Sequence, residues 1–313
     1  MIKIEKYIDI KGNKGRVISK AITDIIKEFS DRADIKKLKK IQIYVTKDPL
    51  KITKKIILPK TKLRRHGEIR EWIFQNLPSF SYLAKGKTPS IMINANEKIF
   101  EGNNYTAMKG LFAHELMHIM NKIDGIEDEL ENEAEKAASK IFYYISRHKE
   151  VKPFTRERLL ASFVRVTTTA LLLIKDVLAN SRAMSFGFDE EIYEYYKESN
   201  SDVKEKMKFT EKSIIKALKK DQKHVLDDAF LAYLGLNNTW ITFKMFHHDK
   251  WTRKLKNMSN IEVPKIIKNN ARYILNELCL IRSGENKKQI AKVLRVTQEK
   301  YFNVVRYFCK RLR

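Results

Sequence analysis

The sequence predicts an α+β protein that is predominantly helical. Its 313 residues include only ten glycines and six prolines, the residues that most often interrupt helices. Apolar residues recur every three or four positions along most of the chain, whereas residues 90–94 alternate as a half-buried strand does. A composition of 43% hydrophobic and 32% charged residues is typical of a folded chain and excludes an intrinsically disordered one.

The first 150 residues predict a unit that mixes strands and helices. In chain order, we expect a helix over 14–30, strands over 41–45 and 54–58 joined through Asp48-Pro49, a short helix over 67–76, and the strand at 90–94. Asn103 and Asn104 are typical of a helix start, and the helix that they introduce is expected over 105–121.

This last helix contains a short motif of two histidines. The segment His114-Glu115-Leu116-Met117-His118 matches the His-Glu-x-x-His pattern of zinc-dependent hydrolases. Residues four apart share one face of a helix, so both imidazoles can reach a single metal ion. Glu115 lies beside them and is placed to accept a proton during hydrolysis. The motif therefore predicts a Zn²⁺ site with Glu115 as the general base.

An acidic helix is expected after a break at Asp124-Gly125. It covers 127–138, and Glu127, Glu131 and Glu135 fall on one of its faces. A carboxylate that completes two imidazoles suits Zn²⁺ and leaves a fourth coordination position open. The acidic run is also conspicuous in a chain that is otherwise so basic.

This stretch resembles a known family. The pattern Glu131-x-Glu133-Ala134-Glu135-x-x-Ala138 is similar to the second-helix signature of gluzincin peptidases, and most similar to that of ImmA/IrrE-type metallopeptidases. The resemblance covers about residues 88–145. It implies a zincin-like N-terminal domain, a protein or peptide substrate, Glu131 as the third zinc ligand and Glu135 as the residue that orients a ligand histidine. The chain departs from the family pattern at Glu135, where Asp or Asn is usual, and at Ala137, where Phe is common.

Two other carboxylates compete with Glu131 for the place of third ligand. Asp124 lies six residues after His118, the spacing of the last ligand in metzincin-type motifs. Asp176 interrupts an apolar helical run, which is an unusual place for a carboxylate. We rank Glu131 first, Asp124 second and Asp176 third. The donor that would stabilise the transition state is left open among four residues, Tyr105, Tyr143, Tyr144 and His148.

The net charge of +25 indicates a polyanionic partner such as nucleic acid; the alternative is the lysine-rich usage that is common in AT-rich microbes. The charge is concentrated at the end of the chain, where residues 251–313 hold 16 Lys and Arg against four acidic residues. Residues 286–305 resemble a helix-turn-helix, with the turn at Arg295-Val296 and Thr297 as the cap of the recognition helix. Three outward residues of that helix are expected to contact duplex DNA: Lys300, Asn303 and Arg306.

The remaining features set the domain plan and the location. Pro153 marks a boundary, which gives a metallopeptidase-like domain over 1–150, a helical domain over 151–255 and the helix-turn-helix-like domain over 256–313. Two cysteines exclude a disulfide framework, and neither a signal peptide nor an apolar run of membrane-spanning length is present. We expect a cytoplasmic zinc metallopeptidase without a membrane partner; the alternative is a DNA-binding regulator whose zincin-like domain is structural or sensory.

Overall fold

The computed structural model describes residues 2–32, 37–48, 79–83, 88–96, 98–102, 104–147, 156–201, 207–222, 224–281 and 287–312. It is mostly helical with one small sheet, so the α+β class is confirmed. The described residues group into two compact units. The sheet unit comprises residues 1–124 and 182–199, and the helical unit comprises residues 125–181 and 200–313. The division into three domains that the sequence suggests stays a prediction.

The sheet unit is built on four strands in the order β1-β2-β4-β3. Strands β1 (Lys3–Ile8), β2 (Lys40–Thr46) and β4 (Ser90–Asn94) are parallel, and β3 (Ser79–Tyr82) runs antiparallel to β4 at one edge. The strands predicted at 41–45 and 90–94 are therefore confirmed, but β4 is buried at all five positions and not half-buried as its alternation predicted. The expected strand at 54–58, the helix at 67–76 and the boundary at Pro153 lie outside the described residues.

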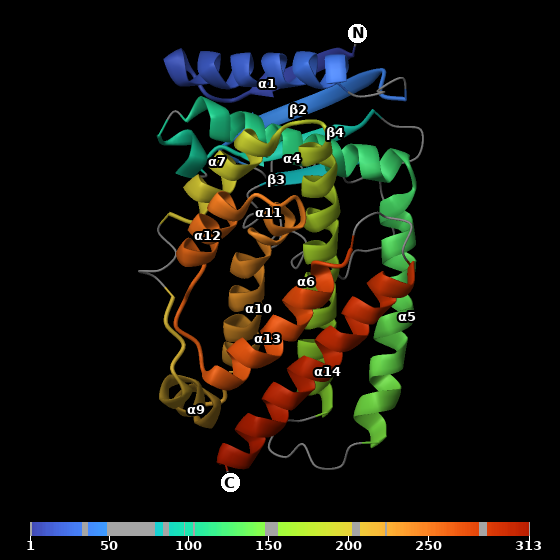
Figure 1. Cartoon of the computed structure of the whole chain (residues 1–313), viewed down its shortest axis with the longest axis vertical. Helices are drawn as coiled ribbons and strands as arrows, with labels where there is room; N and C mark the ends of the chain where they lie inside the picture. Colours follow the sequence, from blue (N-terminus) through green and yellow to red (C-terminus); the bar gives the residue numbers. More distant parts are fainter. Residues whose placement is uncertain are drawn as a thin grey trace. The chain divides into compact units, whose positions relative to one another are not determined.

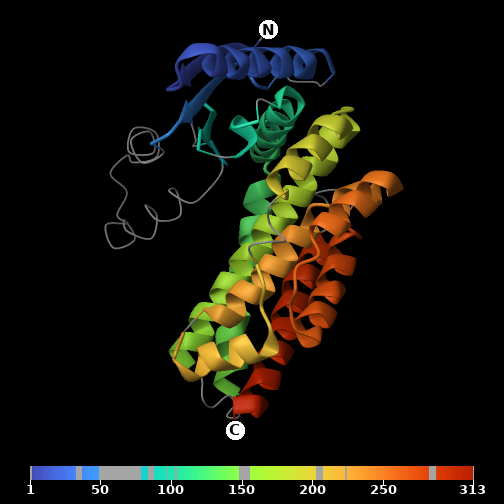
Figure 2. The ribbon, with the colours of Figure 1, turned by 90° about the vertical axis from the view of Figure 1, so that its left-hand side faces the viewer.

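Helix α1 (Gly12–Arg32) follows β1 and confirms the helix predicted over 14–30. Its buried stripe contains Ile18, Ile22, Ile25 and Phe29, spaced by three or four residues as the core face of an amphipathic helix requires. Figures 1 and 2 show α1 (blue) running beside the sheet strands. The helix thus supplies much of the apolar layer of this unit.

Helix α4 (Tyr105–Ile123) follows β4 through the short 3-10 helix η2 (Lys98–Phe100) and packs on α1. The two helices are joined by a hydrogen bond from Tyr105 to Asp24 and by an ion pair of 2.7 Å between Lys109 Nζ and Glu28 Oε1. Lys109 also lies 3.2 Å from Glu191 of α7 (Asp189–Ser199). One lysine therefore connects three helices of the sheet unit.

The crossing of α4 and α7 depends on a residue without a side chain. A Cβ atom added at Gly110 would lie 1.9 Å from the carbonyl oxygen of Glu191 and 2.9 Å from Cβ of Tyr195. Because the closest obstacle is backbone, it cannot move aside as a flexible side chain would. Gly110 therefore sets how closely α7 approaches the helix that carries the two histidines.

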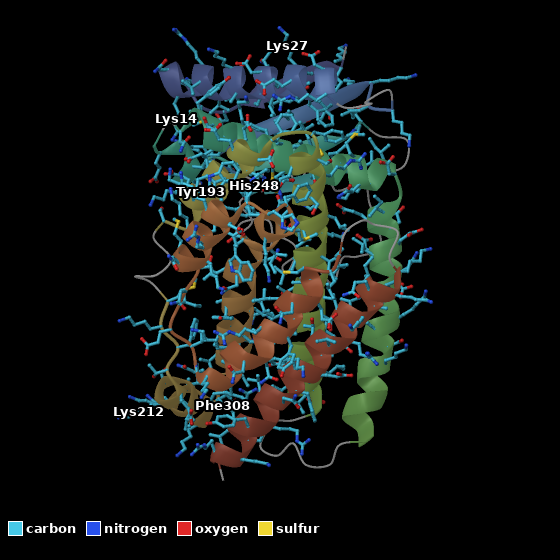
Figure 3. The ribbon with its side chains drawn as sticks, in the orientation of Figure 1. Lys14, Lys27, Tyr193, Lys212, His248 and Phe308 are labelled. Atoms are coloured by element: carbon cyan, nitrogen blue, oxygen red, sulfur yellow. The ribbon has the colours of Figure 1, made fainter. Side chains whose placement is uncertain are left out.

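The helical unit contains the other helices. They are α5 (Ile126–Arg147), α9 (Glu211–Lys219), α10 (Val225–Asn238), α11 (Ile241–Met245), α12 (Asp249–Met258), α13 (Lys265–Leu278) and α14 (Lys287–Leu312). Helix α6 (Arg156–Ser185) belongs to this unit up to Ser181, and its last turn belongs to the sheet unit. Figure 2 shows long helices of the helical unit running alongside one another. Lys212 of α9 and Phe308 of α14 lie at the same end of that unit (Figure 3).

A buried aromatic and polar cluster fixes the centre of the helical unit. The Tyr301 ring lies 5.3 Å from the Phe163 and Phe230 rings, and its hydroxyl donates to the buried Asp227. Burial, together with the adjacent Asp227 carboxylate, raises the pKa of Tyr301 well above its usual value. Arg165 lies 3.7 Å from Asp227 and compensates its charge. The cluster therefore joins α6, α10 and α14.

The structure corrects the helix-turn-helix prediction. Residues 287–312 form one uninterrupted helix, α14, so there is no turn at Arg295-Val296. Thr297 is buried and donates its hydroxyl to the Val293 carbonyl oxygen at 2.8 Å, a bond made inside a helix and not at a cap. The apolar residues keep one helical phase through this point, and no glycine interrupts it, so the chain continues straight. Ile290, Leu294, Tyr301, Val304 and Val305 face inward as expected.

We predict that Gly110→Ala lowers the free energy of unfolding by about 1–3 kcal/mol or more, because the new methyl group overpacks the α4–α7 crossing. The melting temperature should fall accordingly. The measurement is thermal unfolding followed by circular dichroism. The matched control is Gly235→Ala on α10, where an added Cβ has nothing within 4 Å. The control is expected to raise stability slightly, since alanine is the better helix former. Equal effects of the two substitutions would contradict the close-approach argument.

Candidate metal centre

The histidine motif lies on the central, buried part of α4. Asn104 caps this helix, because its side-chain oxygen accepts from the Ala107 backbone N–H at 3.1 Å. The confirmed helix places His114 and His118 one turn apart on one face. Their exposed fractions are only 6% and 9%, and that of Glu115 is 4%. Three polar side chains buried together must find partners, since an unpaired buried polar group is costly.

The two imidazoles satisfy this requirement through each other. Their Nε2 atoms lie 3.1 Å apart, and the rings meet edge to face with centroids 4.6 Å apart. Two nitrogens bound to one tetrahedral Zn²⁺ at about 2.0–2.1 Å would lie about 3.3 Å apart. The observed spacing is thus suited to joint coordination of one ion, and it equally permits a hydrogen bond between the rings. The spacing is therefore compatible with zinc, and zinc binding stays a prediction.

Glu115 points to the sheet edge. Its Oε1 atom accepts a hydrogen bond of 2.5 Å from the hydroxyl of Ser79, the first residue of β3. The hydroxyl restricts the rotation of the carboxylate and leaves the other oxygen available. Sequence reasoning did not identify Ser79, because a four-residue strand gives almost no periodicity and a lone serine gives no chemical signal.

Two tyrosines of α7 extend the surroundings of His114. The ring centroids of Tyr195 and Tyr196 lie 5.9 Å and 6.5 Å from that of His114. They reach the histidine because Gly110, one turn earlier on α4, admits α7 at close range. These aromatic neighbours were also missed in the sequence, where Tyr193, Tyr195 and Tyr196 form part of an ordinary amphipathic helix.

Asp124 is held in an ion-pair cluster inside the sheet unit. It caps α4, with Gly125 in the left-handed region at φ 75° immediately after it. Lys37 Nζ and Arg182 Nη2 each lie 2.8 Å from its carboxylate. Burial alone would raise the pKa of Asp124, but the hydrogen bonds and charges of these two cations outweigh it and hold the pKa below the usual value. Its observed contacts are those of a structural carboxylate.

Glu131 is held in a second ion-pair cluster, inside the helical unit. Lys175 Nζ lies 2.7 Å from Glu131 and 3.1 Å from Glu127. Burial would lower the pKa of Lys175, yet the two carboxylates raise it above its usual value. The Glu131 side chain is 57% exposed, and Glu135 is exposed as well. The roles of Glu131 as a ligand and of Glu135 as an orienting residue stay predictions.

Asp176, the third candidate ligand, is half-buried on α6 in the helical unit. Its role as a ligand stays a prediction.

The other predicted site residues have different surroundings. Tyr105 is engaged with Asp24 of α1, and burial followed by this hydrogen bond raises its pKa. The side chains of Tyr143 and Tyr144 and the whole of His148 lie outside the described residues. Lys300 stacks over the Tyr273 ring at 4.1 Å, and Asn303 and Arg306 are exposed on α14. DNA contact by these three residues stays a prediction, now without the turn that motivated it.

Comparison with known proteins gives no match to a family model, a curated protein or a solved structure. Among the helices that the structure describes, none is both long and apolar enough to cross a membrane.

We predict that Asp124→Asn destabilises the fold by about 1 kcal/mol or less at pH 7, because the ion pairs to Lys37 and Arg182 are lost. A carboxylate with a lowered folded-state pKa stabilises the protein above its unfolded value of about 4, and this stabilisation is lost as the pH falls through the folded-state value. The difference in melting temperature between wild type and variant should therefore shrink from pH 7 to pH 3. A difference that does not change with pH would exclude charge as the cause.

Proposed function

We propose that this protein is a zinc-dependent metallopeptidase. The observation that carries the proposal is the pair of buried imidazole nitrogens on α4, 3.1 Å apart, with Glu115 between them in sequence and bonded to the sheet edge. Imidazole nitrogen with one carboxylate oxygen is the donor set of catalytic zinc sites that keep a position for substrate or water. When bound, Zn²⁺ would supply Lewis acidity at the reacting carbonyl group.

In the proposed reaction Glu115 is the general base. It accepts a proton from the attacking water and passes it to the nitrogen of the leaving amine. The hydrogen bond from Ser79 holds one carboxylate oxygen, so the other can face the water without a search through rotamers. Ser79 is therefore a positioning residue, and its loss should affect turnover more than metal binding.

The sheet edge supports a peptide as the substrate. Strand β3 is at one end of the strand order, so its outer backbone groups have no partner strand within the described sheet. An extended peptide can add to such an edge through main-chain hydrogen bonds. Because Ser79 lies on the same strand and bonds Glu115, a peptide on this edge would lie beside the proposed base.

We propose that a carboxylate is the third ligand, and its candidates are Glu131, Asp124 and Asp176. Glu131 pairs with Lys175, and Asp124 pairs with Lys37 and Arg182, so each of these two would have to exchange cations for the metal. A ligand other than Glu131 would differ from the second-helix glutamate of gluzincins, so the resemblance to ImmA/IrrE-type proteins would then extend to the histidine helix and not to the complete ligand set.

The first test separates metal binding from chemistry. We predict that wild-type protein binds one Zn²⁺ per chain and that His114→Ala or His118→Ala loses it, as measured by elemental analysis after dialysis. Glu115→Gln should keep the zinc and lower hydrolysis of a peptide library by about 10²–10⁴-fold, because only the base is removed. The cleavage products are read by mass spectrometry.

A further variant in this assay tests the positioning role of Ser79. Ser79→Ala should keep zinc and lower kcat by about 10-fold, the range found when a residue that orients a catalytic group is removed. Hydrolysis by Glu115→Gln at the wild-type rate would refute the proposed base, and zinc retained at full occupancy by the His114→Ala/His118→Ala double variant would refute the site.

The second test decides the third ligand. Asp176→Asn and Glu131→Gln each replace a carboxylate by an amide of the same shape, so they are matched variants. We predict that the variant that removes the ligand weakens zinc binding by more than about 100-fold, while the other variant changes it by less than about threefold. Competition with a chromophoric chelator gives both affinities. A large loss in Glu131→Gln would support the ligand that the family resemblance implies, and small losses in both variants would exclude both carboxylates.

A further inference from the structure

A basic pocket in the helical unit has no role in the proposed peptidase. It has a volume of about 420 Å³ and lies among α10, α11, α12 and α13. Among the described residues, four cationic side chains line it and no carboxylate does. The four are Lys244, Lys256, Lys268 and Arg272.

The fold brings these cations together from three helices. Lys268 and Arg272 are four residues apart on α13, and Asn276 continues the same face one turn later. Lys244 of α11 and Lys256 of α12 both lie over the Trp240 ring, with their Nζ atoms 6.0 Å and 5.4 Å from its centroid. Cation–π contact with the indole therefore positions both lysines at the pocket, on the wall opposite α13.

The wall beneath the cations is a fixed polar framework. Asn237 is buried, and its amide donates to the carbonyl oxygens of Tyr233 and Ser259 at 2.9 Å and 3.3 Å. Trp240 Nε1 donates to Asn237 Oδ1 at 3.1 Å, and Arg272 is hydrogen-bonded to Tyr233. The pocket is thus lined by groups whose positions are set by buried hydrogen bonds.

The four pocket cations lack acidic partners among the described residues. Several other cations of the helical unit pair with carboxylates, as in the pairs Lys292–Glu277 and Arg165–Asp228. Glu277 follows Asn276 directly, yet it bonds Lys292 and Gln289 of α14. Across the described residues, none of the four pocket cations forms an ion pair with a carboxylate. Four like charges in one hollow create a positive potential that attracts an anion.

We propose that this pocket binds a phosphorylated small molecule of nucleotide size through its phosphate groups. Arginine presents a planar fork that matches phosphate oxygens, and lysines add point charges around it. A volume of about 420 Å³ lies within the range of small-molecule sites. Three further asparagines at the pocket, Asn257, Asn260 and Asn276, offer both donors and acceptors to the uncharged part of the ligand.

The test is isothermal titration calorimetry of the full chain with inorganic triphosphate and with ATP at 150 mM salt. Both probes are expected to bind at one site per chain, and a tighter ATP complex would show that the nucleoside also contacts the pocket. The Lys268→Gln/Arg272→Gln variant should bind at least about tenfold more weakly, because two of the four cations are lost. The matched control, Lys300→Gln/Arg306→Gln, removes the same charge from α14 outside the pocket and should bind as wild type does.

Two further measurements make the result decisive. Circular dichroism must show that both variants keep their helices, and the His114→Ala/His118→Ala variant should bind triphosphate normally, since this site is independent of the zinc proposal. Equal weakening in the pocket variant and its control would show non-specific charge attraction and overturn the proposal. Binding of a single-stranded oligonucleotide without measurable binding of either small probe would overturn it as well, and would make nucleic acid the ligand of this surface.

Discussion

Helix α4 buries two imidazoles and a carboxylate within two turns, and the sheet unit is arranged around that constraint. Each of these side chains would be costly to desolvate without a partner. The histidines face each other at 3.1 Å, and Glu115 receives the hydroxyl of Ser79. The edge strand, the α7 aromatics and the capping asparagine all contact the apolar helix that buries these three polar side chains.

A backbone contact between α4 and α7 also positions the histidines. Because Gly110 lets the α7 carbonyl approach, α7 covers α4 closely enough for Tyr195 and Tyr196 to lie beside His114. Lys109, the residue before this glycine, pairs with α1 and α7 together. A backbone contact and a shared ion pair at adjacent positions hold the same crossing, so packing and electrostatics position the histidines jointly.

The positively charged side chains fall into two groups, those that pair with carboxylates and those that do not. Many cations that lie near the cores pair with carboxylates, such as Lys175 with Glu127 and Glu131, or Arg182 with Asp124. Such pairs hold helices in register and change the free energy of folding little. Cations without acidic neighbours instead raise the local electrostatic potential. The pocket beside α13 is a place where the second arrangement occurs, and its charge is therefore available to an anionic ligand.

The sequence by itself determined the elements whose pattern is local. The stripe of α1, the existence of the strand β4, the Asn104 cap and the spacing of His114 and His118 all follow from local periodicity and short-range capping. Strand β1 was not predicted, because it lies at a sheet edge and its apolar residues alternate weakly. The helix-turn-helix prediction was wrong because the apolar residues keep one helical period through the expected turn, which has no glycine to end the helix.

Tertiary structure alone decided which distant residues meet. Ser79 reaches Glu115 from a strand 36 residues away, and Arg182 reaches Asp124 across 58 residues. Glu131 had the best sequence motif, and its observed partner is Lys175 of α6. No local pattern encodes such a pairing. Sequence periodicity specifies the face on which a side chain stands, whereas its partner is chosen by the packing of helices whose order in space the local sequence does not contain.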